Sequence, residues 1–575
     1  MNIQALRMAA LWLLAIAAAL ATSGRAADVV VASKPAALSD VKIPMRDGVE
    51  LSANIWLPSA EGKFPVVLLR TPYSKAKSGG SLPSQGYAVV SQDCRGRGQS
   101  AGVWVPFIHE RLDGEDTIRW IARQPWCNGA IGMMGGSYVG FTQWSTAPVS
   151  SDALRALFTT VPLIDPYDDL AYVGGAFQLQ LMMGWGSGTG GSTAMRQWKR
   201  EDWLRTLPLR TWDTALEKPV PYLQDWIAHP QFDDYWKPCS LRGQAQNITT
   251  PIFAVCGWYD IFTASVIRHL NEVRAQSRSP EARKHLHLLM GPWPHGANRS
   301  QKLGDQDFGK DSLVDMPAIQ SQWFDRWLKQ QPSDVDRWPP FRIFVMGRNQ
   351  WRDEQEWPLA RTRFTPCYLH SNGSANTATG DGRLSPDKPA SQQPDRFVYD
   401  PDDPVPTLGG CLLYGGAGPF DQAEIEKRPD VLVFTGEPLT AELEVTGPVK
   451  VVLYAASTAT DTDWTAKLVD VWPDGRAINL CDGIVRARYR QPDDAPSLIE
   501  PGQVYRYEID LWVTSNVFLP GHRVRVEVSS SNFPRFDRNP NTGHAFGADA
   551  QRCKATQTVY HDAEHPSHVL LPVIP

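Results

Sequence analysis

A serine between glycines is the feature of this sequence with the clearest chemical potential. It lies in Gly135–Gly140, directly after the apolar run Ile131–Met134 and before a segment that we expect to be helical. A strand, a tight turn and a helix in this order form a nucleophile elbow, in which small neighbours let a serine hydroxyl project above the sheet. Ser137 is therefore the candidate nucleophile, although serines between glycines usually occupy ordinary turns. Val139 holds the usual position of the second glycine, which comes one residue later at Gly140.

The partners that such a serine needs follow two later strands. A serine hydroxyl becomes a good nucleophile when a histidine removes its proton and a carboxylate orients that histidine. Asp260 comes directly after the apolar run Ile252–Cys256, and His295 comes directly after Leu286–Met290. The order serine, acid, histidine, each after a strand, is typical of α/β-hydrolases and predicts a triad with Ser137. The alternatives are a helix cap for Asp260 and a surface position for His295.

Acyl transfer also needs at least two hydrogen-bond donors for the oxyanion. The backbone N–H of Tyr138, directly after the serine, is one donor by geometry. The second donor usually comes from the loop after an earlier strand, and here that loop is Arg70–Lys75. Its Tyr73 could supply a phenolic O–H, and an amphipathic packing role is the alternative.

The composition excludes several other classes of protein. The 575 residues carry a formal net charge of -5, with 21% charged and 10% aromatic residues, so general disorder is excluded. No basic stripe is present, and we expect no nucleic-acid partner. His285 and His287 share a strand face, but no acidic or cysteine partner lies at ligand spacing, so we expect no metal. Gly186–Gly191 contains G-x-G-x-x-G, a pattern typical of dinucleotide-binding sites, but no buried strand precedes it. We interpret it as a flexible loop and expect no organic cofactor.

The first residues have the pattern of an export signal. Arg7 precedes the apolar run Met8–Leu20, and small residues follow as far as Ala27. A membrane anchor would need about 20 apolar residues, more than this run provides. We expect a signal peptide over residues 1–26 and a periplasmic or secreted protein without a membrane partner. Eight cysteines form no CxxC pair and leave the disulfide pattern open.

The segments around the candidate site predict an α/β domain interrupted by an insertion. The apolar runs Val66–Leu69, Tyr87–Val90 and Ile131–Met134 indicate buried strands, and Asp113–Gln124 indicates a helix between the last two. This alternation is typical of a parallel, doubly wound sheet. Strand signals then vanish over residues 165–247, for which we predict a mostly helical insertion that covers the sheet. Its helical segments are Gln197–Asp213 and Val220–His229.

The character of the chain changes after about residue 338. Before that residue, the apolar runs Ile252–Cys256 and Leu286–Met290 and the helix Ile319–Lys329 continue the α/β pattern. Ser371–Asp395 is polar and reads as a long loop. Beyond it, Lys467–Val471, Tyr505–Leu511 and Arg523–Val528 alternate with period two. Such strands predict a β-sandwich with one solvent-facing side per sheet.

Several of these segments together resemble the CocE/NonD family of serine hydrolases, which is related to X-prolyl dipeptidyl peptidases and α-amino acid ester hydrolases. The resemblance runs from about Val41 to the C-terminus. It implies an α/β-hydrolase domain over residues 27–164 and 248–338, a helical cap at 165–247 and a C-terminal jelly-roll β-sandwich at 339–575. The matching segments are Arg70–Tyr73, Gln92–Ser100, Gly135–Gly140, Gly257–Asp260, Gly291–Gly296, Asp461–Leu468 and Ser530–Pro540.

The resemblance also implies roles for the site residues. Ser137 would be the nucleophile, His295 the general base and acid, and Asp260 the residue that orients the histidine. The hydroxyl of Tyr73 and the N–H of Tyr138 would form the oxyanion hole. A glycine three residues after the serine is common in this family, which accounts for the position of Val139.

Substrate choice within the family depends on charge near the triad. The α-amino acid ester hydrolases hold an ammonium group in a carboxylate cluster, two members of which follow the triad aspartate. Here the apolar Ile261 and Phe262 follow Asp260, and only Asp168 or Asp169 could provide the third member. We therefore expect uncharged, and in particular aromatic, acyl groups. The substrate-binding residues that we expect are Asp168, Asp169, Trp258, Tyr259 and Phe262.

These observations favour a serine hydrolase that cleaves a small ester or amide through an acyl-enzyme, with water as the final acceptor. An X-prolyl dipeptidyl peptidase or an α-amino acid ester hydrolase is the alternative, and either would need a site for a free amine. An inactive polymer-binding protein is the alternative from another class. A homo-oligomer is compatible with all three hypotheses.

Overall fold

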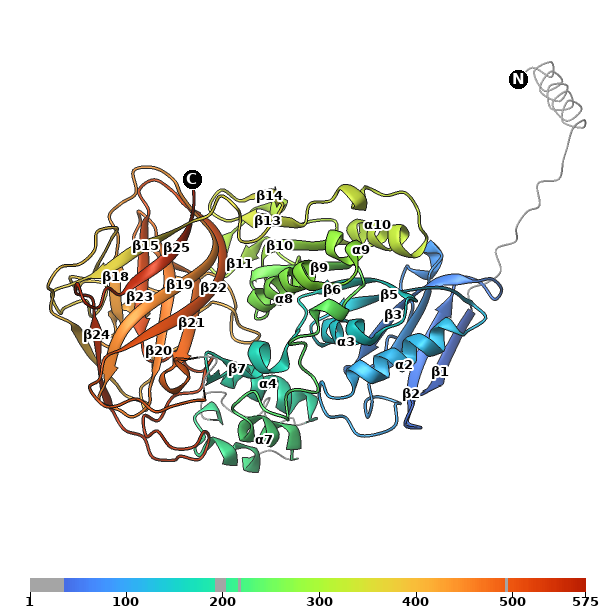
Figure 1. Cartoon of the computed structure of the whole chain (residues 1–575), viewed down its shortest axis with the longest axis horizontal. Helices are drawn as coiled ribbons and strands as arrows, with labels where there is room; N and C mark the ends of the chain where they lie inside the picture. The colour runs from blue at the N-terminus through green and yellow to red at the C-terminus, as the bar shows by residue number, and fades with distance from the viewer. Residues whose placement is uncertain (1–35, 192–202, 216–218, 492–494) are drawn as a thin grey trace, which may run out of the picture.

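The computed structural model describes residues 36–191, 203–215, 219–491 and 495–575. A mixed α/β part and an all-β part lie side by side, and short helices fill the region where they meet (Figure 1). The expected signal peptide and the first residues of the helical segment Gln197–Asp213 lie outside the described residues.

A ten-stranded sheet forms the α/β part of the described chain, in the order β1-β2-β4-β3-β5-β6-β9-β10-β13-β14. Neighbours from β4 to β13 are parallel. The prediction of a parallel sheet is confirmed there. The edge strands, which were not predicted, pair antiparallel: β1–β2 and β13–β14 are hairpins with short loops, and β2 also runs antiparallel to β4. The strands are β1 (Ala36–Pro44), β2 (Glu50–Leu57), β3 (Phe64–Thr71), β4 (Ala88–Asp93), β5 (Cys127–Gly136), β6 (Leu154–Thr160), β9 (Ile252–Tyr259), β10 (Leu286–Pro294), β13 (Phe341–Val345) and β14 (Gln350–Glu354).

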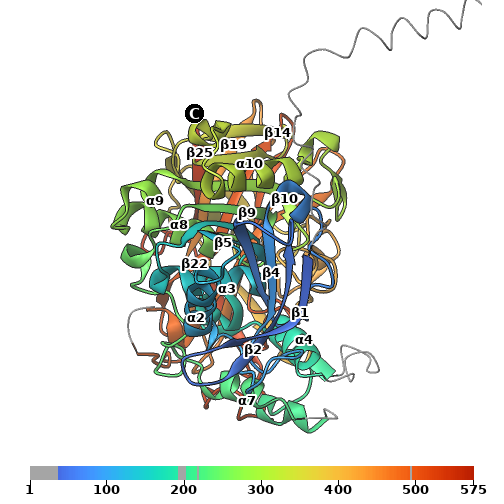
Figure 2. The same ribbon diagram turned by 90° about the vertical axis from the view of Figure 1, so that its right-hand side faces the viewer.

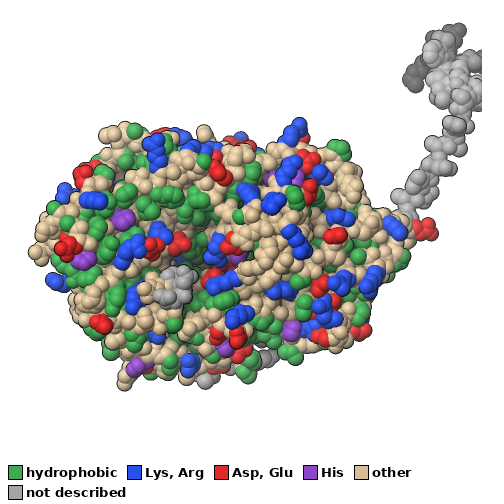
Figure 3. Space-filling model, in the orientation of Figure 1, with side chains coloured by type: hydrophobic (Ala, Val, Ile, Leu, Met, Phe, Trp, Pro, Cys, Tyr) green, Lys and Arg blue, Asp and Glu red, His purple; other side chains and the backbone are tan. Residues whose placement is uncertain are grey.

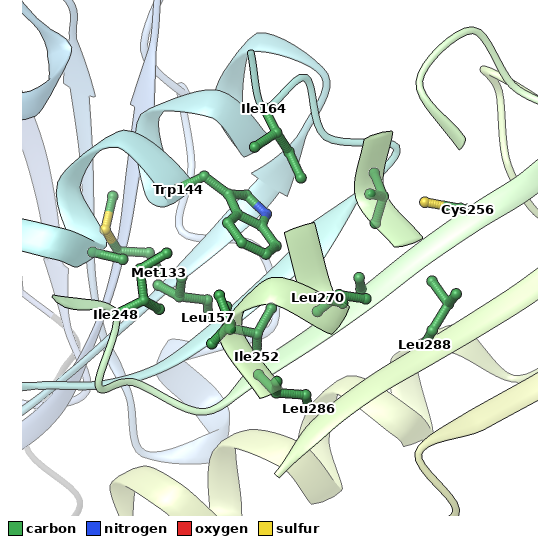
Figure 4. Packing of buried hydrophobic residues seen from close by; sticks show 14 of the residues in the cluster. Met133, Trp144, Leu157, Ile164, Ile248, Ile252, Cys256, Leu270, Leu286 and Leu288 are labelled. Atoms are coloured by element: carbon green, nitrogen blue, oxygen red, sulfur yellow. The ribbon is translucent and has the colours of Figure 1, made fainter. Parts of the chain in front are cut away.

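Helices cover both faces of this sheet. In β3, Val66 and Leu68 belong to the core under α2 (Glu110–Ala122), α3 (Tyr138–Thr146) and α8 (Thr263–Gln276), whereas Val67 belongs to the core under α10 (Met316–Leu328). Because side chains alternate along a strand, a continuous apolar run is needed when both faces are buried. Figure 2 shows the first strands at the front with α2 and α3 to one side. Figure 4 shows Trp144 of α3 and Leu270 of α8 within the first core.

The described part of the insertion after β6 holds short helices and a small hairpin, β7 (Tyr172–Val173) with β8 (Ala176–Phe177). Its helices in the described residues include a turn of π-helix at Pro166–Ala171, α4 (Leu179–Thr189) and α7 (Pro221–Ala228). The prediction of a flexible loop at Gly186–Gly191 is wrong, because α4 continues to Thr189. A Cβ at Gly186 would lie 2.4 Å from a methyl carbon of Leu223, so glycine there lets α4 approach α7.

Eleven strands of the described chain fold over a second core, which contains Trp464, Tyr507 and Leu571. β20 and β21 are buried on both sides, unlike the predicted sandwich strands. Gln422 lies over them, accepting from Lys467 of β20 at 2.8 Å and donating to Asn479 of β21 at 3.3 Å, and the cap contacts the end of β21. The backbone N–H of Arg486 donates to the Gly174 carbonyl of the cap at 2.8 Å. The strands are β15 (Arg363–His370), β16 (Arg383–Ser385), β17 (Asp395–Tyr399), β18 (Leu432–Thr435), β19 (Leu443–Ser457), β20 (Asp463–Val471), β21 (Ala477–Arg486), β22 (Tyr505–Phe518), β23 (Arg523–Ser529), β24 (Ala555–Tyr560) and β25 (His568–Ile574).

Two boundaries differ from the expectation. The α/β sheet continues beyond residue 338, because β13 pairs with β10. The segment Ser371–Asp395, predicted as a long loop, contains the short strand β16, which pairs with β15. Three residues of local sequence carry too little periodicity to reveal such a strand.

A buried cation joins the sandwich to the cap. The Arg486 guanidinium lies 2.8 Å from Asp463 and 2.9 Å from Asp537. Asp537 also accepts a hydrogen bond of 2.8 Å from the backbone N–H of Phe177 in the cap. The buried guanidinium therefore has two carboxylate partners, one of which is also tied to the backbone of the cap.

Acidic and basic side chains are interspersed over the face in Figure 3. Within the described ranges, no helix has both the length and the apolar character needed to cross a bilayer.

Candidate active site

Ser137 sits on the sharp turn that the sequence predicts. β5 ends at Gly136 and α3 begins at Tyr138, so a single residue connects strand and helix. Its φ of 58° and ψ of -125° lie outside the regions that a residue with a side chain normally adopts. The Ser137 N–H donates to the Thr160 carbonyl of β6 at 3.0 Å, which holds the strained turn against the sheet.

The glycines around the serine are required by close contacts. A Cβ at Gly135 would lie 2.2 Å from Cγ1 of Val139. A Cβ at Gly140 would lie 2.7 Å from the Cβ of Pro162, in the segment after β6. A glycine is therefore needed at position 140, three residues after the serine, where α3 passes Pro162. Position 139, two residues after the serine, has room for a valine.

His295 and Asp260 form a short hydrogen bond. His295 Nδ1 lies 2.6 Å from Asp260 Oδ1, and the Asp260 side chain is fully buried. The other carboxylate oxygen accepts from the backbone N–H of Phe262 at 3.2 Å. Because α8 begins at Thr263 and is preceded by Phe262, Asp260 is not its N-cap residue.

Another glycine lets the loops that carry these two residues approach each other. β9 and β10 pair in parallel, with Gly257 opposite Gly291. A Cβ at Gly257 would lie 2.0 Å from the carbonyl oxygen of Trp293, two residues before His295. No other residue type fits at Gly257 without separating the loop that carries the acid from the loop that carries the histidine.

Ser137 and His295 line one small pocket of about 20 Å³ with Tyr73, Tyr138 and Phe262. Phe262 meets the His295 ring edge to face, with 5.4 Å between the ring centroids. All three parts of the fold contribute to the walls, which are almost entirely apolar. The remaining lining residues are Phe107, Leu163, Leu170, Leu181, Trp185, Ile261 and Leu413.

Tyr73 follows β3 and brings a phenol to Ser137. The residue is 45% exposed overall, and its hydroxyl oxygen accepts a hydrogen bond from the indole N–H of Trp185 at 3.0 Å. Burial raises the pKa of Tyr73 to about 12, although hydrogen bonds with Trp185 and Ser137 oppose the rise. The phenol therefore keeps its proton at neutral pH and can act as a donor.

The side chain of Tyr138 is fixed by a buried polar network. Its hydroxyl donates to Glu110 Oε1 at 2.9 Å and accepts from the backbone N–H of Phe107 at 2.9 Å. Glu110 in turn forms an ion pair of 2.9 Å with Arg70, which is fully buried. As the first residue of α3, Tyr138 has a backbone N–H without an acceptor inside the helix, at its positive end.

Two of the expected substrate-binding residues lie outside this pocket. β9 continues to Tyr259, so Trp258 and Tyr259 are strand residues rather than loop residues. Trp258 is buried and donates to the Phe344 carbonyl at 2.7 Å, and Tyr259 is buried and donates to the Asn479 carbonyl at 3.4 Å. Both contribute to packing in the core beside the site.

Asp168 and Asp169 also lie outside the Ser137 pocket, in a neighbouring cleft of about 1270 Å³. Asp168 forms an ion pair of 2.6 Å with Arg242. Asp169 accepts hydrogen bonds from the Asp165 N–H at 2.7 Å and the Ser265 hydroxyl at 2.6 Å. Burial raises the pKa of Asp169 to about 6.

Apart from Ile261 and Phe262, sequence patterns did not identify the apolar residues of the pocket. Leu181 and Trp185 come from the cap, and Leu413 comes from the sandwich, far from the elbow along the chain. Each is a single apolar residue in an apolar neighbourhood, so only tertiary structure distinguishes it from core.

Comparisons with known proteins agree with this architecture. The profile of the X-Pro dipeptidyl-peptidase (S15 family) matches residues 47–297, and that of the X-Pro dipeptidyl-peptidase C-terminal non-catalytic domain matches residues 333–570. The chain is 41% identical over 571 aligned residues to the cocaine esterase of Rhodococcus sp. (strain MB1 Bresler), covering 93% of this chain and 98% of that protein. The chain belongs to the CocE/NonD family of serine hydrolases. It is a hydrolase.

Solved structures of family relatives match along nearly the whole chain. An aminopeptidase from a marine sediment Thaumarchaeota archaeon has a TM-score of 0.82 and 27% identity, covering 95% of this chain and 97% of its own. An α-amino acid ester hydrolase has a TM-score of 0.78 and 26% identity, covering 96% and 100%. This chain therefore shares its α/β-hydrolase fold and following β-sandwich with these two structures.

The described residues contain no group of three or more His, Cys, Asp and Glu side chains that could hold a metal ion. His285 and His287 lie with their rings 6.1 Å apart, against Trp327 and Trp323 respectively. All eight cysteines are free thiols.

We predict that Glu110→Gln destabilises the protein by about 3–5 kcal/mol, because it leaves the buried charge of Arg70 without a partner. Urea unfolding followed by tryptophan fluorescence measures the loss. Glu115→Gln is the matched control on the same helix, since its partners Arg46 and Arg119 have side chains 45% and 56% exposed. It should cost less than about 1 kcal/mol. Equal losses in both variants would show that the Arg70–Glu110 pair has no special role.

Proposed function

We propose that this protein is a serine esterase in which Ser137 is the nucleophile, His295 the general base and acid, and Asp260 the orienting carboxylate. The observation that carries the proposal is the 2.6 Å bond between His295 Nδ1 and buried Asp260, beside a serine on a strained elbow in the same pocket. A carboxylate only accepts hydrogen bonds, so Nδ1 carries the proton and Nε2 is left with the lone pair that a serine proton requires.

The reaction then proceeds by acyl transfer in two halves. Ser137 Oγ attacks the ester carbonyl while its proton passes to Nε2 of His295, and the same proton is then given to the leaving alcohol. Water repeats the sequence on the acyl-enzyme and releases the acid. The oxyanion of each tetrahedral intermediate is stabilised by the Tyr73 O–H and the Tyr138 N–H, which is at the positive end of α3.

The acyl group is uncharged and of modest size. The walls of the pocket, including Leu181, Ile261 and Phe262, offer no charge to an ammonium group. Asp168 is already paired with Arg242, and Asp169 is bonded within its own loop. A free α-amine would thus lose its hydration without gaining a partner, which disfavours the peptidase and amino acid ester hydrolase alternatives.

We predict that Ser137→Ala abolishes turnover of phenyl acetate and leaves the unfolding midpoint within about 1 °C of wild type. A hydroxyl in a water-accessible pocket contributes little to stability. A fluorophosphonate probe with mass spectrometry should modify Ser137 in wild type and leave the alanine variant unlabelled. Full activity in the variant would remove the mechanism, and absence of any adduct on wild type would favour an inactive binding protein.

We further predict faster turnover of phenylacetic acid methyl ester than of phenylglycine methyl ester, which differs only by an α-ammonium group. Burying an unpaired charge in the apolar pocket should lower kcat/KM by at least about tenfold. Kinetics at pH 6 and pH 9 provide the control, because neutralising the amine should reduce the difference. Preference for the amino ester at both pH values would contradict the proposed acyl site.

We also propose that the protein is exported, on the basis of Arg7, the apolar run Met8–Leu20 and the small residues around Ala26. Expression of the full chain in a Gram-negative host should place the mature protein in the periplasm, with an N-terminus near Ala27 by Edman sequencing. A protein that keeps Met1 and stays in the cytoplasm would contradict export.

A further inference from the structure

We propose that Trp185 of the cap is a positioning residue for the reaction, which holds the hydroxyl of Tyr73 so that its proton points at the oxyanion. The inference rests on the proposed function, in which Tyr73 is an oxyanion donor. In this inference the cap helps to stabilise the transition state through Trp185, in addition to lining the acyl pocket.

The direction of one hydrogen bond determines where the Tyr73 proton lies. The indole nitrogen of Trp185 is 3.0 Å from the Tyr73 oxygen. An indole N–H can only donate, so the Tyr73 oxygen accepts and its own proton must point elsewhere. Tyr73 lines one pocket with Ser137, beside which the oxyanion forms in the proposed mechanism. The indole N–H therefore leaves the Tyr73 hydroxyl proton one orientation in which it can be donated to the oxyanion.

The donation also strengthens Tyr73 as a donor. A hydroxyl that accepts one hydrogen bond donates a second one more strongly, because the chain of bonds polarises the O–H. A tyrosine phenol is protonated at neutral pH, so Tyr73 acts as a neutral donor and not as a competing anion. Pre-orientation before substrate arrives means that no rotation of the hydroxyl is needed during the reaction.

Trp185 is itself held by a stack of aromatic rings. Phe107, Tyr138 and Trp226 lie nearly parallel to it, with centroid distances of 5.7, 5.9 and 6.1 Å and interplanar angles of 21°, 25° and 16°. The stack fixes the plane of the indole, and hence the line along which its N–H points. One of these rings is the side chain of Tyr138, whose backbone N–H is the other proposed oxyanion donor.

The alternative is that Trp185 only encloses the acyl group. Trp185→Phe separates the two roles, because it keeps an aromatic ring in the stack and removes the N–H. Trp104→Phe is the matched control: its ring lies 6.2 Å from Trp185 at 68°, and its indole nitrogen is buried without a hydrogen-bond partner among the described residues.

The experiment is a double-mutant cycle on kcat and KM for phenyl acetate. Trp185→Phe should lower kcat about tenfold with KM within about twofold, as expected for one hydrogen bond that acts in the transition state. Tyr73→Phe should lower kcat about 100-fold. The double variant should be no slower than Tyr73→Phe alone, because without the hydroxyl the indole has nothing to orient. Trp104→Phe should lower kcat less than about threefold.

A second readout distinguishes orientation from packing. Phenylboronic acid forms a tetrahedral adduct with a nucleophilic serine, and Trp185→Phe should weaken its binding by the same factor as kcat/KM. Losses that multiply in the double variant, an effect confined to KM, or unchanged boronate affinity would each overturn the role of Trp185. An inactive Ser137→Ala variant beside any of these results would show that the esterase proposal stands and only the positioning role has failed.

Discussion

The hydrogen bond between His295 and Asp260 is the interaction on which the candidate site depends. It joins loops that follow two adjacent parallel strands, β9 and β10, and the carboxyl ends of parallel strands meet at one edge of a sheet. The elbow that carries Ser137 follows β5 at the same edge. Much of the sheet therefore serves to bring three side chains together that are separated by 123 and 35 residues along the chain.

Close backbone approach is the structural cost of this arrangement, and glycines make it possible. Gly257 lets the acid loop lie against Trp293, and Gly140 lets α3 pass Pro162. The strain of Ser137, with φ at 58°, is held by its neighbours in β6. Buried polar groups support the elbow as well: the Arg70–Glu110 pair fixes the side chain of Tyr138, whose backbone N–H is a proposed oxyanion donor. The cap completes the site from above through Trp185.

Sequence patterns predicted the candidate residues that come just after strands. Apolar runs mark the strands, and the order serine, acid, histidine of α/β-hydrolases indicates which of the following residues form the triad. They failed where a strand was longer than its apolar run. β9 continues three residues past Cys256, so Trp258 and Tyr259 are strand residues that pack into the core beside the site instead of facing the pocket. The arginine that pairs with Asp168 lies 74 residues away in the sequence, and no local pattern encodes such a partner.

Sequence patterns also did not predict the edge strands of the α/β sheet or the contacts between the α/β part, the cap and the sandwich. The hairpin strands at both ends of the α/β sheet have no crossover helix, which is the signal that identifies a parallel strand. Leu413 and Trp185 reach the pocket from different parts of the chain, and only folding shows that they share it. The sequence thus predicted the candidate triad more completely than the residues that line the acyl pocket.

The most direct test of the central claim is a crystal structure of the wild-type protein after reaction with a fluorophosphonate. The account predicts a covalent bond from phosphorus to Ser137 Oγ, with the phosphoryl oxygen within hydrogen-bonding distance of the Tyr73 hydroxyl and the Tyr138 N–H. His295 should keep its bond to Asp260 in that adduct. A phosphoryl oxygen turned away from both donors, or attachment to another residue, would contradict the account.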